Sequence, residues 1–185
     1  GLAASGGADE CASMTTGDEL QALLAEHAGE NLVAVKFFAP WCRACRALDP
    51  KYKAIAKEFR RDGQPVVFSE MNYQELSSTK AGVALAKALN VNALPMIHFY
   101  AGETTAEQAR ACHADASAAG DDDAAQPPQP VAAFPCGPKK IGLLREKLEQ
   151  WRGWTVAPGG VAAVAAAVAT ADEVADAAAD AAAAA

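Results

Sequence analysis

Trp41-Cys42-Arg43-Ala44-Cys45 is the stretch that decides the fold of this chain of 185 residues. The residues before it, 31–40, are mostly apolar, which indicates a buried strand. After it, apolar side chains recur every three or four residues as far as Phe59, which indicates one face of a helix. The two cysteines therefore lie where a strand gives way to a helix.

The start of a helix is a favourable place for a reactive thiol. Unpaired N–H groups and the positive end of the helix dipole stabilise an anion there, so a thiol ionises more readily. The thiolate is the form that attacks disulfides. Arg43 and Arg46 add positive charge, and the spacing lets Cys42 and Cys45 close a small disulfide ring. The pattern predicts a redox-active pair.

A metal site is the main alternative for a Cys-x-x-Cys pair. Zinc takes about four ligands, and the sequence contains no second cysteine pair. His98 and His113 are isolated, and His98 falls in a predicted strand, where we expect it to be packed. The sequence therefore favours redox chemistry and assigns no metal ligand. A binding module that holds zinc or an iron–sulfur cluster stays open as the alternative.

Two separated segments resemble a known family. Residues 37–45, with the pattern Phe-Phe-Ala-Pro-Trp-Cys-x-x-Cys, are similar to the active site of thioredoxins. Residues 90–100 are similar to the thioredoxin segment in which a cis proline precedes a strand. With Cys136-Gly137 further on, the chain is most similar to the atypical cysteine/histidine-rich thioredoxins of plant and algal chloroplasts. The resemblance covers about residues 17–151.

The resemblance implies an α/β thioredoxin fold, with a central mixed sheet of about four strands and helices on both faces. The apolar periodicity places the elements in that order along the chain. We expect strands at about 31–40, 65–72, 96–101 and 131–134, and helices at about 17–29, 42–60, 77–89 and 138–151.

The domain itself is expected over residues 14–152. Residues 1–13 are small and polar and are predicted to be disordered, Cys11 among them. Residues 103–130 are acidic and rich in alanine and proline, so we expect a loop that expands a hairpin turn and in which Cys112 is incidental. The alanine-rich, acidic residues 153–185 are predicted to be a disordered or weakly helical tail.

Charge and composition exclude several functions. The formal charge is −7, and the acidity belongs to the insertion and the tail, so no basic stripe is available for nucleic acid. No apolar run is long enough to span a bilayer, which predicts no membrane partner. Five cysteines without regular spacing argue against a secreted disulfide framework and favour a reducing compartment.

The activity that the resemblance implies is thiol–disulfide exchange with target proteins. Cys42 would attack as a thiolate, and Cys45 would resolve the mixed disulfide. No bound cofactor is needed, because the electrons reside in the pair. A disulfide-forming oxidant or isomerase is the second alternative, since Arg43-Ala44 stands where reducing thioredoxins usually have Gly-Pro.

The resemblance also implies a substrate surface around the pair. Trp41 is expected beside the cysteines, and a cis peptide bond at Pro95 would leave the backbone of Leu94 free to pair with an extended substrate. Gly137 is placed at the rim of this surface. Cys136 is expected there as well, either as a modulating thiol or as a buried structural cysteine.

Lys36 is a departure from the family. Thioredoxins usually carry an acidic residue at this position, six residues before the first cysteine. A charged Lys36 would stabilise thiolates together with Arg43 and Arg46, and a neutral one would accept a proton. The simplest alternative is that its stem follows the core and its ammonium reaches water.

The expected partners are proteins with disulfides or thiols, peroxiredoxins among them, and a thiol reductant or reductase. The resemblance suggests the chloroplast stroma, and without it the cytoplasm would be expected. We expect a monomer.

Overall fold

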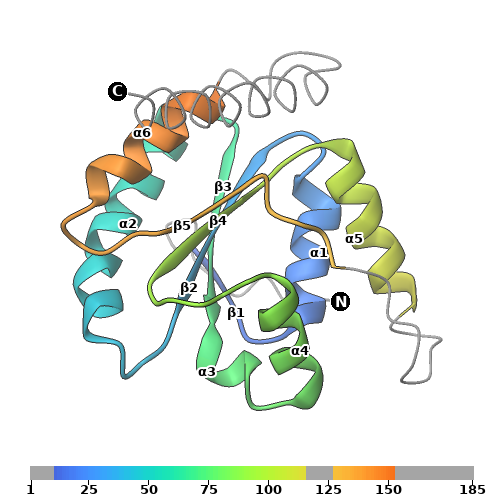
Figure 1. Ribbon diagram of the computed structural model, residues 1–185. Coiled ribbons are helices and arrows are strands. Elements are labelled where there is room, and N and C mark those ends of the chain that lie inside the picture. The colour runs from blue at the N-terminus through green and yellow to red at the C-terminus, as the bar shows by residue number, and fades with distance from the viewer. Residues whose placement is uncertain (1–10, 116–126, 153–185) are drawn as a thin grey trace, which may run out of the picture.

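A computed structural model describes residues 11–115 and 127–152 of the chain (Figure 1). Five strands form one mixed sheet in the order β1-β3-β2-β4-β5. Their bounds are β1 Ala12–Met14, β2 Leu32–Phe38, β3 Val66–Asn72, β4 Met96–Tyr100 and β5 Ala132–Pro135. β2 pairs parallel with β3 and antiparallel with β4. The strand that leads to the cysteines is therefore the central one.

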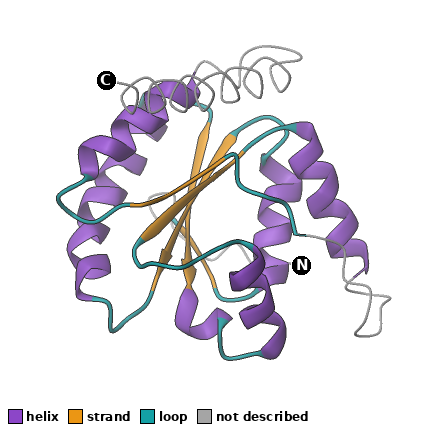
Figure 2. Cartoon of the chain, viewed as in Figure 1, coloured by secondary structure: helices purple, strands orange, loops and turns teal. Residues whose placement is uncertain are grey.

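Helices cover both faces of this sheet (Figure 2). α2 and α6 lie on one side, and α1 and α5 lie together on the other, with α4 below them in the view of Figure 1. Their bounds are α1 Gly17–His27, α2 Arg43–Arg61, α3 Tyr73–Leu76, α4 Lys80–Ala88, α5 Glu103–Asp115 and α6 Ile141–Arg152. The α/β thioredoxin fold expected from the sequence is confirmed, with one strand more than expected.

The alternation of side chains along β2 divides the core into two layers. Leu32 and Ala34 belong to the apolar cluster under α2 and α6, whereas Val33, Val35 and Phe37 belong to the cluster under the other helices. Successive side chains of a strand point to opposite faces, so a strand covered on both sides reads as a continuous apolar run. This is the physical reason why residues 31–40 were recognisable as a buried strand.

The first strand corrects the expectation for residues 11–13. Ala12–Met14 pairs parallel with Ser69–Met71 at the edge of the sheet, and both Cys11 and Met14 are buried. A strand of three residues with one large apolar side chain leaves almost no periodic signal in the sequence. Residues 1–10 and 153–185, which were predicted to be disordered or weakly helical, lie outside the described residues.

α5 corrects part of the predicted loop. Glu103–Asp115 is a helix, and Ala106, Ala109 and Cys112 are buried in it. The chain enters it at Gly102, where a φ of 104° favours glycine, and the Gly102 N–H donates to the Ala28 carbonyl 2.6 Å away. The buried face consists of small side chains, so no stripe of large apolar residues indicated a helix. The rest of the predicted insertion up to residue 126 lies outside the described residues.

The last strand and helix agree with the sequence. β5 pairs antiparallel with β4, so residues 96–101 and 131–134 form the expected hairpin around a long connection. α6 buries Leu144, Leu148 and Trp151 against the sheet side that carries α2. None of the helices in the described part of the chain is long and apolar enough to cross a membrane.

His98 is buried among apolar residues on β4, as expected. Its Nδ1 atom lies 3.2 Å from the Tyr100 hydroxyl, and its ring centroid lies 4.7 Å from that of Phe37. The Nε2 atom has no hydrogen-bond partner among the described residues. Burial therefore lowers the pKa of His98 to about 4, because the charged ring cannot be solvated there.

His98 should make the stability of the fold depend on pH. The unfolded chain takes up the His98 proton near its ordinary pKa, well above the folded one, so stability is complete above about pH 6.5 and falls as the pH drops towards 4. The loss from this residue reaches about 3 kcal/mol at pH 4. A phenylalanine at this position cannot take up a proton, so the variant His98→Phe should not lose this stability. Urea titrations at pH 7.5 and at pH 4 should therefore show the free energy of unfolding of the wild type falling by about 3 kcal/mol relative to that of His98→Phe. A difference that stays constant from pH 7.5 to pH 4 would contradict the assignment.

Candidate active site

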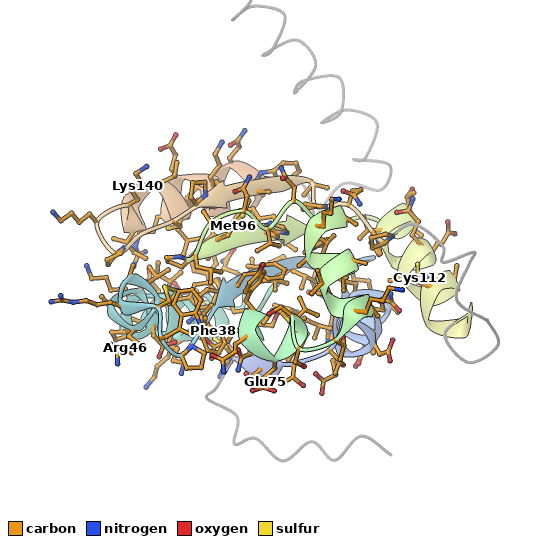
Figure 3. All side chains as sticks on the ribbon, turned by 60° about the horizontal axis from the view of Figure 1, so that its bottom comes forward. Phe38, Arg46, Glu75, Met96, Cys112 and Lys140 are labelled. Carbon is orange, nitrogen blue, oxygen red and sulfur yellow. A yellow bond between two sulfur atoms is a disulfide. The ribbon has the colours of Figure 1, made fainter. Side chains whose placement is uncertain are left out.

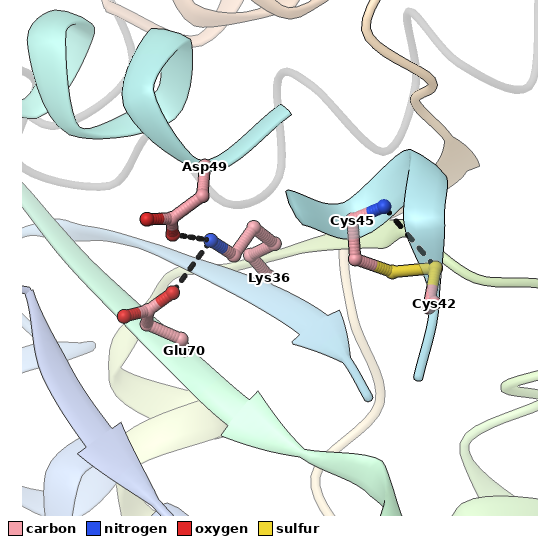
Figure 4. The surroundings of a disulfide bond; sticks show 5 residues. All are labelled: Lys36, Cys42, Cys45, Asp49 and Glu70. Atoms are coloured by element: carbon pink, nitrogen blue, oxygen red, sulfur yellow. Dashed lines mark hydrogen bonds and ion pairs between the residues drawn. A yellow bond between two sulfur atoms is a disulfide. The ribbon is translucent and has the colours of Figure 1, made fainter. Parts of the chain in front are cut away.

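The cysteine pair lies between β2 and α2. Cys42 and Cys45 form a disulfide (Figure 4). Cys42 caps the N-terminus of α2, and its Sγ atom accepts the Cys45 N–H at 3.1 Å. A sulfur in this position faces the unpaired N–H groups of the first helical turn, which stabilise negative charge. The local geometry thus supplies the environment that favours a thiolate on Cys42.

Both cysteines are buried, but not to the same extent. Cys42 is 7% exposed and Cys45 is 2% exposed, so Cys42 is the more accessible of the two. Trp41 is 67% exposed directly before them, which places a large aromatic surface at the solvent side of the pair. Arg43 and Arg46 are exposed on the first turns of α2. The arrangement suits an approaching partner that meets Trp41 and Cys42 first.

The loop before β4 completes this surface. The Leu94–Pro95 peptide bond is cis, and the Leu94 side chain packs against the cluster formed by Ala39 and the two cysteines. No hydrogen bond joins the backbone of Leu94 to another residue in the described part of the chain. Its N–H and C=O groups are therefore available to an extended strand. The structure brings Leu94, Pro95 and the cysteine pair together, and their role in binding a substrate stays a prediction.

Cys136 and Gly137 lie next to this loop. The Cys136 N–H donates to the Pro95 carbonyl at 3.0 Å, and a side chain at Gly137 would meet nothing within 4 Å. The Cys136 thiol itself is fully buried and lies 3.5 Å from the Lys140 carbonyl oxygen. Burial raises the pKa of Cys136, which disfavours the reactive thiolate. Its environment is that of a packed cysteine, and its modulating role stays a prediction.

Lys36 does not reach water. Its side chain is 1% exposed, and its Nζ atom lies 2.6 Å from Asp49 of α2 and 2.5 Å from Glu70 of β3 (Figure 4). The alternative in which the ammonium reaches water is therefore excluded. Figure 4 shows the ammonium directed towards the two carboxylates rather than towards the disulfide. Both carboxylates stabilise its positive charge inside the protein.

Asp49 and Glu70 were missing from the sequence prediction. Asp49 follows Cys45 by one helical turn and is partly exposed, whereas Glu70 is almost fully buried. Burial acts to raise the pKa of Asp49, but hydrogen bonds from Lys36 and Lys53 hold it below its ordinary value. One feature of the sequence could have indicated this ion pair. Lys36 and Glu70 carry opposite charges and lie in two predicted strands whose other residues are mostly apolar. In the register of the sheet these two residues stand side by side.

The described residues contain no group of three or more histidine, cysteine or acidic side chains that would form a metal site. His98 is packed in the core, on the face of the sheet that carries α1 and α4. The polar group that contacts the Cys42 Sγ atom is the backbone N–H of Cys45, which suits a thiolate.

Comparison with known proteins agrees with this geometry. A family model described as Thioredoxin matches residues 12–118. Thioredoxin-like 2-2, chloroplastic, of Arabidopsis thaliana is 41% identical over 75 residues, which cover 40% of this chain and 28% of that protein. The thioredoxin of Geodia cydonium is 36% identical over 86 residues, which cover 46% of this chain and 70% of that protein. The chain thus spans less than a third of the length of the Arabidopsis relative.

A solved structure shows the same architecture. The thioredoxin of Fasciola hepatica superposes with a TM-score of 0.51 at 23% sequence identity, covering 75% of this chain and 97% of that one. At this identity the likeness concerns the fold alone.

Replacing Lys36 should destabilise the fold strongly. Lys36→Met keeps the length of the side chain but removes the buried cation of Glu70 and Asp49, and breaking a buried ion pair costs about 3–5 kcal/mol. Lys53→Met is the matched control, because Lys53 pairs with the same two acids from a partly exposed position and should cost less than about 1 kcal/mol. Urea denaturation measures both. Equal losses would show that the buried ammonium has no special role.

Proposed function

The chain belongs to the thioredoxin family, and from this premise we propose that it exchanges disulfides with target proteins through Cys42 and Cys45. The observation that carries the proposal is the Cys42–Cys45 disulfide at the start of α2, next to the cis Pro95 loop. The sequence motif alone predicted the pair. The fold adds a surface on which an extended segment of another protein can lie.

In the reducing direction, the Cys42 thiolate attacks one sulfur of the target disulfide. The target S–S bond breaks, a Cys42–target S–S bond forms, and the other target sulfur leaves as a thiolate that takes up a proton. Cys45 then loses its proton and attacks the Cys42 sulfur, which releases the second target thiolate and closes the Cys42–Cys45 disulfide. Two electrons pass from the pair to the target. The oxidising direction is the exact reverse.

Four residues form the proposed substrate surface. Trp41 offers an exposed aromatic face beside Cys42. The backbone groups of Leu94, held by the cis bond to Pro95, pair with the substrate chain in the manner of an added strand. The open space at Gly137 lets that chain approach closely. We propose that these four residues bind the target around its disulfide.

The direction of exchange depends on the stability of the thiolate. Arg43 and Arg46 are exposed at the N-terminus of α2 and add to the positive potential that faces Cys42. Stabilising the thiolate stabilises the reduced pair and makes the couple more oxidising. This supports the disulfide-forming activity as the second candidate. A redox titration of the Cys42–Cys45 couple against glutathione separates a reducing from an oxidising role.

We further propose that the protein acts in the chloroplast stroma. The basis is the similarity to relatives that are named as chloroplastic, at 41% and 37% identity over parts of their length. The partners in this proposal are target proteins with disulfides or thiols, including a peroxiredoxin, and a thiol reductase that recharges the pair.

The roles of the two cysteines can be tested by trapping. Cys45→Ser should still attack through Cys42 but should not release its target, so long-lived mixed disulfides with proteins of a chloroplast extract should accumulate. Cys42→Ser and the double variant Cys42→Ser/Cys45→Ser are the controls and should capture nothing. Non-reducing gels followed by mass spectrometry identify the complexes. Capture by Cys42→Ser but not by Cys45→Ser would reverse the assignment.

A further inference from the structure

We propose that a cationic rim beside the disulfide selects target proteins whose disulfide is flanked by acidic residues. The rim consists of Arg43, Arg46 and Lys51 on α2, and Lys139 and Lys140 in the turn before α6. The inference rests on the proposed function, because it concerns the substrates of the same site. It adds a charge-based specificity to the apolar and backbone contacts described above.

Contacts between distant segments connect the rim to the helix that begins at the cysteines. Arg43 and Arg46 each follow one of the cysteines directly. The Lys51 Nζ atom donates to the Pro138 carbonyl at 2.8 Å, which fastens the turn containing Lys139 and Lys140 to α2. The same turn begins at Cys136, whose N–H is bonded to Pro95. The lysines therefore lie on the side of the cis-proline loop that faces α2.

The rim is exposed and its charge is not neutralised. All five side chains are exposed, and none of them forms an ion pair with another residue in the described ranges 11–115 and 127–152. In Figure 3 the labelled Arg46 and Lys140 both lie at the left-hand end of the molecule. Residues 39–48 and 134–145 contain no aspartate or glutamate. The positive potential at this end of the molecule is thus uninterrupted along both segments.

The nearest acids on α2 do not cancel this potential. Asp49 is bound to Lys36 and Lys53 at 2.6 and 3.1 Å. Glu58 is bound to Arg145 at 2.6 Å. Their negative charges are already compensated by cations outside the rim. A chain with a formal charge of −7 therefore presents a locally positive surface where its substrate docks.

The shape of the rim favours an acidic peptide segment over a small anion. The five cations are distributed over a helix and a turn, so they face a length of chain rather than converge on one point. Arginine forks bind carboxylates in two-pronged geometry, and lysines act as point charges for the same groups. Complementary charge of this kind raises the rate of encounter, in favourable cases by a factor of 10 or more. The occupant we infer is an acidic stretch next to the target disulfide.

Three disulfide peptides of equal length test the inference. They share one scaffold and carry acidic, neutral or basic residues beside the disulfide, and the reduced protein is mixed with each under single-turnover conditions. At about 20 mM salt, where charges interact over long distances, we expect the acidic peptide to be reduced about tenfold faster than the neutral one. At about 500 mM salt the two rates should converge, because exposed charges are screened.

Charge-reversal variants locate the effect. Lys140→Glu should lower the acidic-to-neutral rate ratio at low salt by about threefold or more while the neutral peptide is reduced as before. Lys57→Glu is the matched control: it is also an exposed lysine, but it lies about 20 Å from Arg43 along α2, and it should lower the ratio clearly less than Lys140→Glu does. Equal rates for the acidic and neutral peptides, or equal effects of the two variants, would overturn the inference. If no peptide is reduced at all, the proposed function itself fails.

Discussion

The buried ammonium of Lys36 holds together three elements of the domain, among them the strand and the helix that carry the cysteine pair. It lies on β2 and binds Asp49 of α2 and Glu70 of β3, so the helix that presents the cysteines is fastened to both central strands at one point. Tyr52 repeats this connection one turn later, where its hydroxyl lies 2.8 Å from the Ala34 carbonyl and 3.0 Å from the Ser69 carbonyl. The position of α2 against the sheet, and with it the position of the disulfide, depends on these polar contacts inside an otherwise apolar layer.

This network also changes what Lys36 does to the cysteines. Together with Lys53 it balances two carboxylates, so the cluster as a whole carries little net charge. The field that favours the Cys42 thiolate then comes from the start of α2 and from Arg43 and Arg46, which have no such compensation. The charges thus fall into two groups: the buried ones fix the geometry, and the exposed ones are those to which we assign the proposed effects on the sulfur and on the partner.

The sequence predicted the structure well where large apolar residues recur, or where cysteine or proline stands in a family motif. The runs at 31–40 and 96–101, the cysteine pair and Pro95 led to the central sheet and to the surface beside the cysteines. The sequence contained no recognisable pattern where small residues form the packed face. α5 is the example, because its buried face is formed by Ala106, Ala109 and Cys112. The sequence prediction also missed Asp49 and Glu70, because an ion pair between segments far apart in sequence becomes visible only when the strands are placed in register.

The hairpin of β4 and β5 has a consequence for how the chain folds. The two strands of a hairpin are normally joined by a turn of a few residues. Here residues 101–131 lie between β4 and β5. Closing such a loop costs about 2 kcal/mol more than closing a short one, since each doubling of length adds about 0.6 kcal/mol. α5 packs against α1, so residues 103–115 of this connection are held against the domain. The pairing of β5 with β4, which brings Cys136 next to Pro95, therefore carries an entropic cost that a short turn would not impose.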